Sequence, residues 1–144
     1  MTAIAFTAAN VSANEERGSV IDRYTTGEVI GLGMAVYLDG SNVAWKAKSD
    51  SSAHANAIGI AAIADNFSAE TTIPTGGTVA VVVFGPVQGF TGLVSGEPVW
   101  VDSTAGQMND TAPTGGAYQY VVGHAIDANT ILVDPGTTSP VSHA

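Results

Sequence analysis

Three histidines, together with the many serines and threonines of the chain, are the side chains that could carry out nucleophilic catalysis. The chain has no cysteine, so the nucleophile would be a hydroxyl and the base would be His54, His124 or His143. No Gly-x-Ser-x-Gly elbow is present, because the stretch "GLVSGE" holds Ser95 in a different register. His124 follows Gly123 in an expected β-strand, where a packing or interface role is the simpler interpretation. We therefore expect no catalytic residue and no enzymatic activity.

The acidic side chains indicate neither a glycosidase nor a metal site. Glycosidase carboxylates pair in space, but here the acids are isolated, and five of them stand beside residues that form turns; these are Asp39, Asp65, Asp102, Asp110 and Asp134. No His-x-x-x-His motif occurs, and "DNFSAE" lacks the glycine and terminal spacing of an EF-hand. The stretch "GLGMAV" lacks the third glycine and the helix of a dinucleotide fingerprint, and no lysine follows a glycine-rich loop. We expect no metal and no cofactor.

The charge is distributed unevenly over the 144 residues. All four basic residues, Arg17, Arg23, Lys46 and Lys48, lie in the first third, and the net charge is −9. Such a surface repels nucleic-acid phosphates and acidic membranes, so neither is an expected partner. No apolar run approaches the roughly 20 residues of a membrane span, and the N-terminus has no secretory signal pattern. The absence of cysteine fits a reducing cytoplasm.

The elements that position these residues are expected to be strands. Short β-rich runs, each ended by Gly, Pro, Asn or Asp, predict a sandwich or barrel. The expected strands are Val29–Leu38, Val43–Ala47, Ala57–Ala64, Thr78–Phe84, Val87–Phe90, Pro98–Asp102, Gln119–Ile126 and Thr130–Val133. The stretch "YLDGSNVAW" predicts a hairpin, and "TVAVVVF" indicates a strand buried on both faces.

One phrase occurs twice. Both "GMAVYLDG" and "GEPVWVDS" fit Gly-x-small-Val-aromatic-aliphatic-Asp, starting at Gly33 and Gly96. A second phrase, aliphatic-Gly-x-Ala, follows each copy with Gly59 and Gly123, 26 and 27 residues further on. Two copies are too few for a solenoid, so the repetition predicts one barrel or sandwich of two similar halves. Chance similarity among Gly-, Ala- and Val-rich strands is the alternative.

The expected fold is therefore all-β: a single small barrel or sandwich, jelly-roll or tulip-like, over residues 24–136. Residues 1–23 carry scattered apolar side chains and are expected to form an extended N-terminal arm that becomes ordered against a neighbour. Residues 137–144 are expected to be a flexible C-terminal tail. Two long loops, Ala64–Gly77 and Asp102–Gly116, interrupt the halves.

These phrases carry a family resemblance. The stretches "GEVIGLGMAVYLDGSNVAWKA", "AIGIAAIA", "VAVVVFGPVQGF", "SGEPVWVD", "GQM" and "VVGHAIDANTILVDPG" lie between about Gly27 and Gly136. Together they resemble the small head-decoration (cement) proteins of tailed bacteriophages. The long segment before Arg23 is not a required part of that pattern, which leaves the mode of attachment open.

The resemblance implies a non-enzymatic protein of the virion, made in the host bacterial cytoplasm and located on the outer capsid surface. It would bind the expanded phage head, bridge neighbouring major capsid proteins and stabilise the particle against the pressure of the packed DNA. The resemblance also implies self-association, as a homotrimer or else a homodimer. The expected capsid or subunit contacts are Ile4, Phe6, Val11, Arg17 and Arg23 in the arm, with Phe84, Val87 and Phe90 where they are exposed.

Two other readings stay open. A head-fibre base or a carbohydrate-binding surface module would need exposed aromatic side chains, which Trp45, Trp100, Tyr118 and Tyr120 could supply. A small β-barrel enzyme would need an activity that depends on His124. The sequence names neither the host nor the symmetry axis that the protein would occupy.

Overall fold

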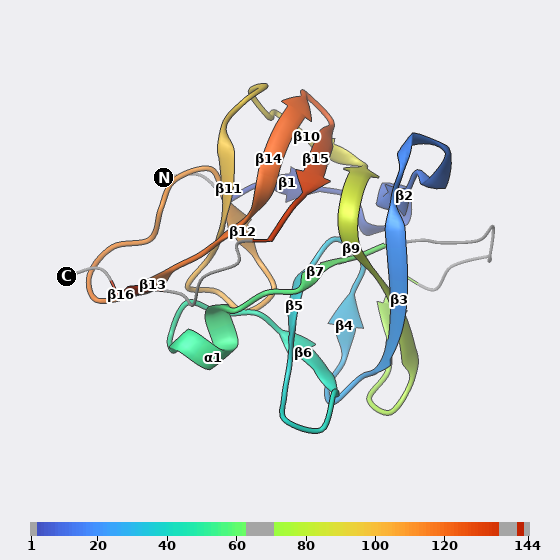
Figure 1. Ribbon diagram of the computed structural model, residues 1–144, viewed down its shortest axis with the longest axis vertical. Coiled ribbons are helices and arrows are strands. Elements are labelled where there is room, and N and C mark those ends of the chain that lie inside the picture. The colour runs from blue at the N-terminus through green and yellow to red at the C-terminus, as the bar shows by residue number, and fades with distance from the viewer. Residues whose placement is uncertain (1–2, 63–70, 136–140, 143–144) are drawn as a thin grey trace.

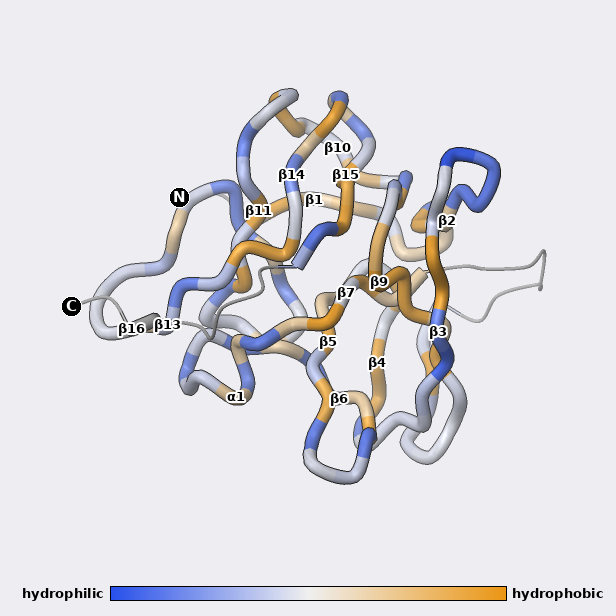
Figure 2. Tube along the Cα trace, viewed as in Figure 1, coloured by the Kyte–Doolittle hydropathy of each residue, from blue (hydrophilic) through white to orange (hydrophobic). Residues whose placement is uncertain are grey.

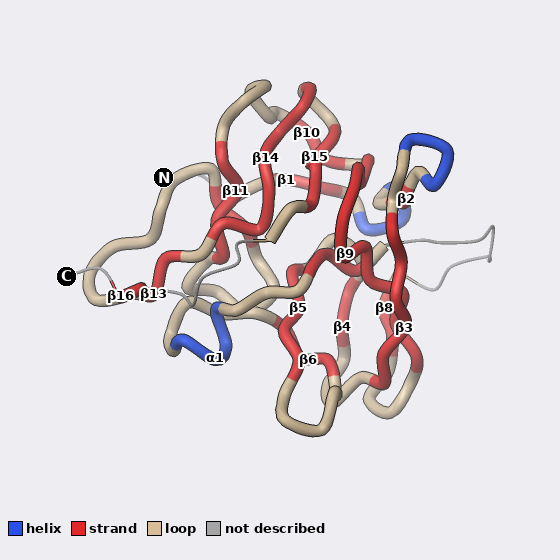
Figure 3. Tube along the Cα trace, in the orientation of Figure 1, coloured by secondary structure: helices blue, strands red, loops and turns tan. Residues whose placement is uncertain are grey.

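The computed structural model describes residues 3–62, 71–135 and 141–142. These residues form mainly short strands, with one α-helix, α1 (Ser52–Ala55), and two 3-10 turns, η1 (Ala8–Asn10) and η2 (Glu15–Arg17) (Figure 3). The predicted all-β class is confirmed. Within the described ranges, no helix has the length and apolar character needed to cross a membrane.

A ten-stranded, strongly curled sheet forms the centre of the fold. Its main path runs β12 (Met108–Asn109), β11 (Pro98–Val101), β14 (Val121–Asp127), β15 (Thr130–Val133), β9 (Thr78–Gln88), β7 (Gly59–Ala61), β5 (Ala35–Leu38) and β6 (Ala44–Lys46). Two further strands, β2 (Ser12–Ala13) and β3 (Val20–Thr25), pair with β9 off this path. Three two-stranded pairs complete the fold: β1 (Ala5–Phe6) with β10 (Phe90–Thr91), β4 (Ile30–Gly31) with β8 (Thr72–Ile73), and β13 (Tyr118–Gln119) with β16 (Val141–Ser142).

The eleven-residue strand β9 joins the two sides of the molecule, and Figure 1 shows it between β14 and β15 on one side and β4 to β6 on the other. Along its first part it pairs with β3 and β7, so that Val82 faces Ile21 on one edge and Ile60 on the other. Along its second part it pairs with β2 and β15. Both edges are occupied, and Val79, Val81 and Val82 are buried, whereas Thr78 and Phe84 at the two ends of "TVAVVVF" are exposed. The predicted burial on both faces therefore holds for the middle of this run and not for its ends.

The sequence predicted two strands, Thr78–Phe84 and Val87–Phe90, where the structure has the single strand β9 to Gln88. Gly85 keeps the strand continuous, because its φ of +105° fits glycine and a side chain there would lie 2.6 Å from the Cα of Ser19. Pro86 still takes a place in the ladder, opposite Leu132 of β15. The Gly-Pro pair therefore lets Ser19 approach closely without ending the strand.

The core consists mostly of Val, Ala and Ile side chains brought together by the sheet. Its largest fully buried members are Phe90, Ile30, Ile60, Met108 and Ile131. Figure 2 shows the apolar chain concentrated along β7, β9 and β15, whereas the turn that contains η2 is strongly polar. The turn that contains η2 therefore lies at the surface, and β7, β9 and β15 contribute the buried apolar side chains.

The two copies of the repeated phrase lie in β5 and β11 and use one pairing register. Val36 of β5 is the Cα partner of Gly59, and Val99 of β11 is the Cα partner of Gly123. A side chain added at Gly59 would lie 2.0 Å from the carbonyl oxygen of Val82. The same addition at Gly123 would lie 2.0 Å from the carbonyl oxygen of Leu132. Each copy thus has a glycine where the next strand passes too closely for any side chain.

The described part of the N-terminal segment does not form an extended arm. Ala3 forms a bridge with Asn109, β1 pairs with β10, and β2 and β3 pair with β9. The backbones of β1, β2 and β3 pair with strands of the same chain, and Ile4 and Val11 are buried in its core, which is the physical reason for the difference. Of the expected flexible tail, Val141–Ser142 form β16, and the remainder lies outside the described residues. Much of the expected Ala64–Gly77 loop, residues 64–70, also lies outside them.

Candidate interaction surface

An exposed apolar pair lies where β3 begins beside β9. Val20 and Phe84 are Cα partners in these strands, and 50% and 49% of their surfaces are exposed. Cross-strand partners on one face have their Cβ atoms about 4.5–5.5 Å apart, so the two side chains form one patch. We call Val20 and Phe84 the β3/β9 patch. Adjacent exposed apolar side chains of this kind favour contact with another protein.

The turn before β3 fixes the position of Val20. Asn14 accepts a hydrogen bond from the backbone N–H of Arg17 at 3.2 Å through its side-chain oxygen. The Ser19 hydroxyl donates to the carbonyl of Pro86 at 2.7 Å and accepts from the backbone N–H of Asn14 at 2.8 Å. Ser19 is thereby buried against β9, and Val20 follows it directly at a bulge in the β3 ladder. These hydrogen bonds attach the start of β3, and with it Val20, to β9.

Exposed charged side chains precede and follow Val20 along the chain. Arg17 in η2 and Arg23 in β3 are exposed. Asp127 accepts a hydrogen bond from the backbone N–H of Asn129 at 2.8 Å, which is the main cause of a pKa below the ordinary aspartate value. The positive charge of Arg17 lowers the pKa of Asp127 further. Exposed charges in the elements that lead into and out of Val20 are of the kind found in the polar rim of protein–protein interfaces.

The structure divides the predicted contact residues into two groups. Ile4, Val11, Val87 and Phe90 are buried, with 6%, 0%, 0% and 1% of their surfaces exposed. In this conformation they pack in the core of their own chain, so their prediction as surface contacts is corrected here. The reason is that β1, β2 and β9 pair with neighbours of the same chain and turn these side chains inward.

Phe6 is half-buried and packs against the core. It packs against Phe90 edge to face, with 5.8 Å between the ring centroids. Only Arg17, Arg23 and Phe84 of the predicted set lie at the surface. The sequence reading placed Val20 in the arm and did not assign it as a contact. The run "VIDRYT" could have indicated a short strand that begins with apolar side chains, and thus a place for Val20 at the edge of the sheet.

The histidines do not form a recognisable catalytic arrangement in the described part of the chain. His54 Nδ1 lies 2.8 Å from Asp50 Oδ1, and its ring packs against Tyr37 with 5.0 Å between centroids. The nearby Ser51 hydroxyl accepts from the backbone N–H of His54, not from its ring. His124 is exposed on β14. His143 lies outside the described residues, and among those described no three His, Asp or Glu side chains group as metal ligands do.

A second surface feature lies on the β5–β6 hairpin. Tyr37 and Trp45 are Cα partners, and both are half-buried. Trp45 Nε1 donates to Asp39 Oδ2 at 2.9 Å, while Asp39 Oδ1 accepts from the backbone N–H groups of Ser41 and Val43. The hydrogen bond from Trp45, followed by those from Val43 and Ser41, holds the pKa of Asp39 below its ordinary value. Trp45, one member of the aromatic pair, is therefore held in place by an ionised carboxylate.

Comparison with known proteins adds no relative: no protein-family model matches the chain, and no curated protein matches its sequence.

Proposed function

We propose that this chain is a non-enzymatic capsid decoration protein of a tailed bacteriophage. It binds the outer surface of the expanded head, bridges neighbouring major capsid proteins and stabilises the particle against internal DNA pressure. The observation that carries the proposal is the β3/β9 patch, an exposed apolar pair on neighbouring strands of a β fold. The resemblance of the repeated phrases to cement proteins supplies the class of partner.

The shared register of the two phrases supports a barrel built from two similar halves. Beyond the Val36–Gly59 and Val99–Gly123 pairs, Ile60 faces Val82 in one copy as His124 faces Leu132 in the other. We propose that each half contributes β-sheet to one barrel whose outer face meets the capsid. The jelly-roll or tulip-like form stays a prediction.

Self-association fits the same surface. A homotrimer, with a homodimer as the alternative, would bury the β3/β9 patch either between copies or against the lattice. A protein that binds only the expanded lattice stabilises that lattice by mass action, because each binding event lowers the free energy of the expanded state alone. No reactive group is needed for this role.

The test compares binding to two states of the head. Purified chain is mixed with expanded heads assembled without it and with unexpanded proheads, and bound copies per major capsid protein are counted by quantitative mass spectrometry. We expect saturable binding to expanded heads at a simple lattice ratio and little binding to proheads. Absence of binding to expanded heads, or equal binding to both forms, would overturn the proposal. Phe84→Asp should reduce binding. The matched control is Val94→Asp, at an exposed valine in the loop between β10 and β11.

The Tyr37–Trp45 pair favours one second candidate, a carbohydrate-binding surface module of the virion. Paired aromatic side chains beside carboxylates suit a sugar ring, whose apolar face stacks while its hydroxyls donate hydrogen bonds. Binding to a glycan array that is lost in Trp45→Ala but kept in Phe84→Asp would support this role. Loss of head binding in Trp45→Ala without any glycan binding would oppose it.

A further inference from the structure

The outer strand of each copy of the repeat, β6 in the first and β12 in the second, pairs with a different kind of chain segment. In the first copy, β6 meets the chain that continues directly from β3. Thr26 and Ala44 form a parallel bridge, and the backbone N–H of Gly27 donates to the carbonyl of Ala44 at 2.9 Å. The backbone N–H of Lys46 donates to Glu28 at 3.0 Å. Neighbouring chain segments close this copy.

In the second copy, the first described residues lie between β12 and β10. Ala3 forms an antiparallel bridge with Asn109, and the backbone N–H of Ile4 donates to the carbonyl of Met108 at 2.9 Å. On the other side, β1 pairs with β10. Residues 3–6 therefore act as a strand inserted in a groove, and that strand comes from the other end of the sequence.

Two inward side chains hold this strand in the groove. Ile4 is 6% exposed and the ring of Phe6 packs edge to face on Phe90. The Phe6 ring also covers Gly33, where an added Cβ would lie 2.4 Å from it. Ala5, between them, points outward and is exposed. Main-chain pairing with alternate side chains in sockets is the usual mode by which a protein binds an extended segment.

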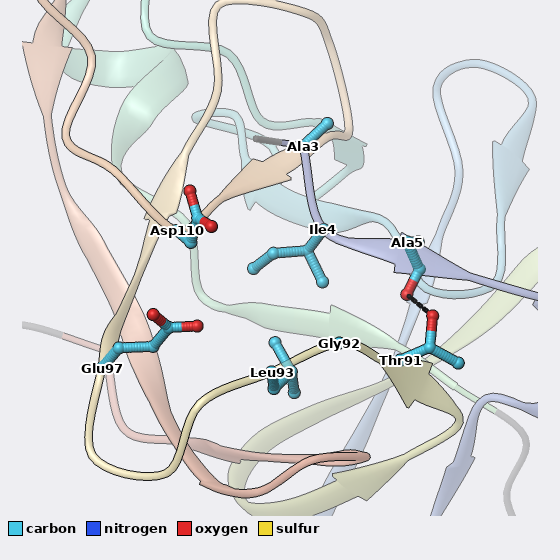
Figure 4. A pocket seen from close by; sticks show the side chains of 8 residues that line it. All are labelled: Ala3, Ile4, Ala5, Thr91, Gly92, Leu93, Glu97 and Asp110. Atoms are coloured by element: carbon cyan, nitrogen blue, oxygen red, sulfur yellow. Dashed lines mark hydrogen bonds between the residues drawn. The ribbon is translucent and has the colours of Figure 1, made fainter. Parts of the chain in front are cut away.

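The inserted strand does not fill its groove. A hollow of about 190 Å³ runs beside it, and its lining is Ala3, Ile4, Ala5, Thr91, Gly92, Leu93, Glu97 and Asp110. Figure 4 shows Ile4 and Leu93 pointing toward each other across this space, with Glu97 and Asp110 at one end. A water needs only about 10–15 Å³, so the space admits several. Ile4 therefore lacks partner atoms on one side, and the strand loses dispersion contacts that close packing would give.

A short exposed turn connects the strand to the rest of the chain. The turn η1 contains no buried residue, and Thr7, which precedes it, makes no side-chain capping hydrogen bond. The first fully buried residue after it is Val11, and β2 then pairs with β9. Only the few residues between Phe6 and Val11 would have to change conformation for the strand to leave its groove.

We propose that the groove between β10 and β12 accepts residues 3–6 of a second copy of this chain. The occupant fits because the structure already shows this sequence seated there, and a second copy carries the same Ile4 and Phe6. The contacts in the groove are the same whichever copy supplies the strand, and only the conformation of the turn at Thr7–Asn10 differs. Exchange of an identical element between copies is a low-cost route to oligomers. The proposal rests on the self-association proposed above.

Cysteine cross-linking tests the exchange, and the cysteine-free sequence makes the result easy to read. Ala5 and Thr91 are exposed Cα partners, so Ala5→Cys with Thr91→Cys brings two thiols into disulfide range. We expect non-reducing gels of the oxidised double variant to show mostly covalent dimers or trimers. The control is His124→Cys with Leu132→Cys, a pair within the β14–β15 hairpin that links inside one chain. Mostly intramolecular Ala5–Thr91 disulfides would overturn the proposal.

A mixing experiment covers the case in which no disulfide forms. The single variants Ala5→Cys and Thr91→Cys, distinguished by mass, are mixed at low concentration of denaturant, returned to buffer and treated with a short bis-maleimide. Exchange predicts a cross-link between the two different chains, and its absence contradicts exchange.

Light scattering of the unmodified chain separates the two proposals. A monomer excludes both exchange and self-association, whereas an oligomer with strands retained in their own chains excludes exchange alone.

Discussion

Val20 and Phe84 lie opposite each other on β3 and β9, and about half of each side chain is exposed although most of their apolar neighbours on β9 are buried. The bulge at Val20 and the close passage of Ser19 over Gly85 place the pair at a bend. Because both side chains sit on a support fixed by Ser19, they can be changed without disturbing the core.

Replacing Phe84 by Asp should weaken self-association by about tenfold or more, because a charge would enter the centre of the apolar patch. The free energy of unfolding should change by about 1 kcal/mol or less, since the side chain is half-exposed. Sedimentation velocity over a concentration series measures the first quantity and urea unfolding the second. Val94→Asp, at 63% exposure, should alter neither. Unchanged association in Phe84→Asp would remove the patch from the interface.

Replacing Ile4 by Ala should lower the free energy of unfolding by about 2–4 kcal/mol, as for other buried aliphatic side chains. The adjacent hollow places the expected value toward the lower end, because part of the side chain already lacks neighbours. Ala5→Ser, on the outward side of the same strand, should change it by about 0.5 kcal/mol or less. An Ile4→Ala variant as stable as the wild type would mean that residues 3–6 behave as the free arm expected from the sequence.

Alanine at Gly59 or at Gly123 should destabilise the protein by similar amounts, about 1–3 kcal/mol or more, because each new Cβ meets a carbonyl oxygen at 2.0 Å. Gly40→Ala is the control, since nothing lies within 4 Å of its added Cβ. Thermal and urea unfolding of the three variants would measure this. A large effect at only one of the two glycines would contradict the proposed equivalence of the halves.

Asp39 should contribute to acid sensitivity. Its pKa in the folded protein is lowered, chiefly by the hydrogen bond from Trp45, so its ionised form favours folding. That contribution is complete above the ordinary aspartate pKa and is lost as the pH falls through the lower, folded value. The stability difference between wild type and Asp39→Asn should therefore shrink as the pH falls from about 5 to about 2. Urea unfolding at several pH values measures it, and Trp45→Phe should reproduce part of the change. A difference that is constant with pH would contradict the assignment.

Local patterns in the sequence predicted the central strands and the glycine-marked repeat because both depend on residues close together in the chain. They did not predict the continuity of β9, since Gly85-Pro86 is also a common end to a strand. The positions of Ile4 and Val11 were not predictable either. Their burial depends on partners such as Met108 that are distant in sequence, and no local periodicity records such contacts.

The surface was predicted in part for a similar reason. Phe84 was predicted as a contact together with Val87 and Phe90 of "VFGPVQGF", on the condition of exposure, and of the three only Phe84 is exposed. Val20 was assigned to an arm, so its role opposite Phe84 required the β3–β9 register. A patch made by two strands becomes visible only when their pairing is known.

The insertion of residues 3–6 beside Met108 also sets an order of events during synthesis. Ile4 leaves the ribosome 104 residues before its hydrogen-bond partner, which at about 5–20 residues per second is an interval of roughly 5–20 s. During that time an apolar strand and its hinge are in solution without a groove to enter. On a polysome, several copies of the chain grow side by side. A chain that has just completed its groove then has younger neighbours whose residues 3–6 are made but whose own grooves are not.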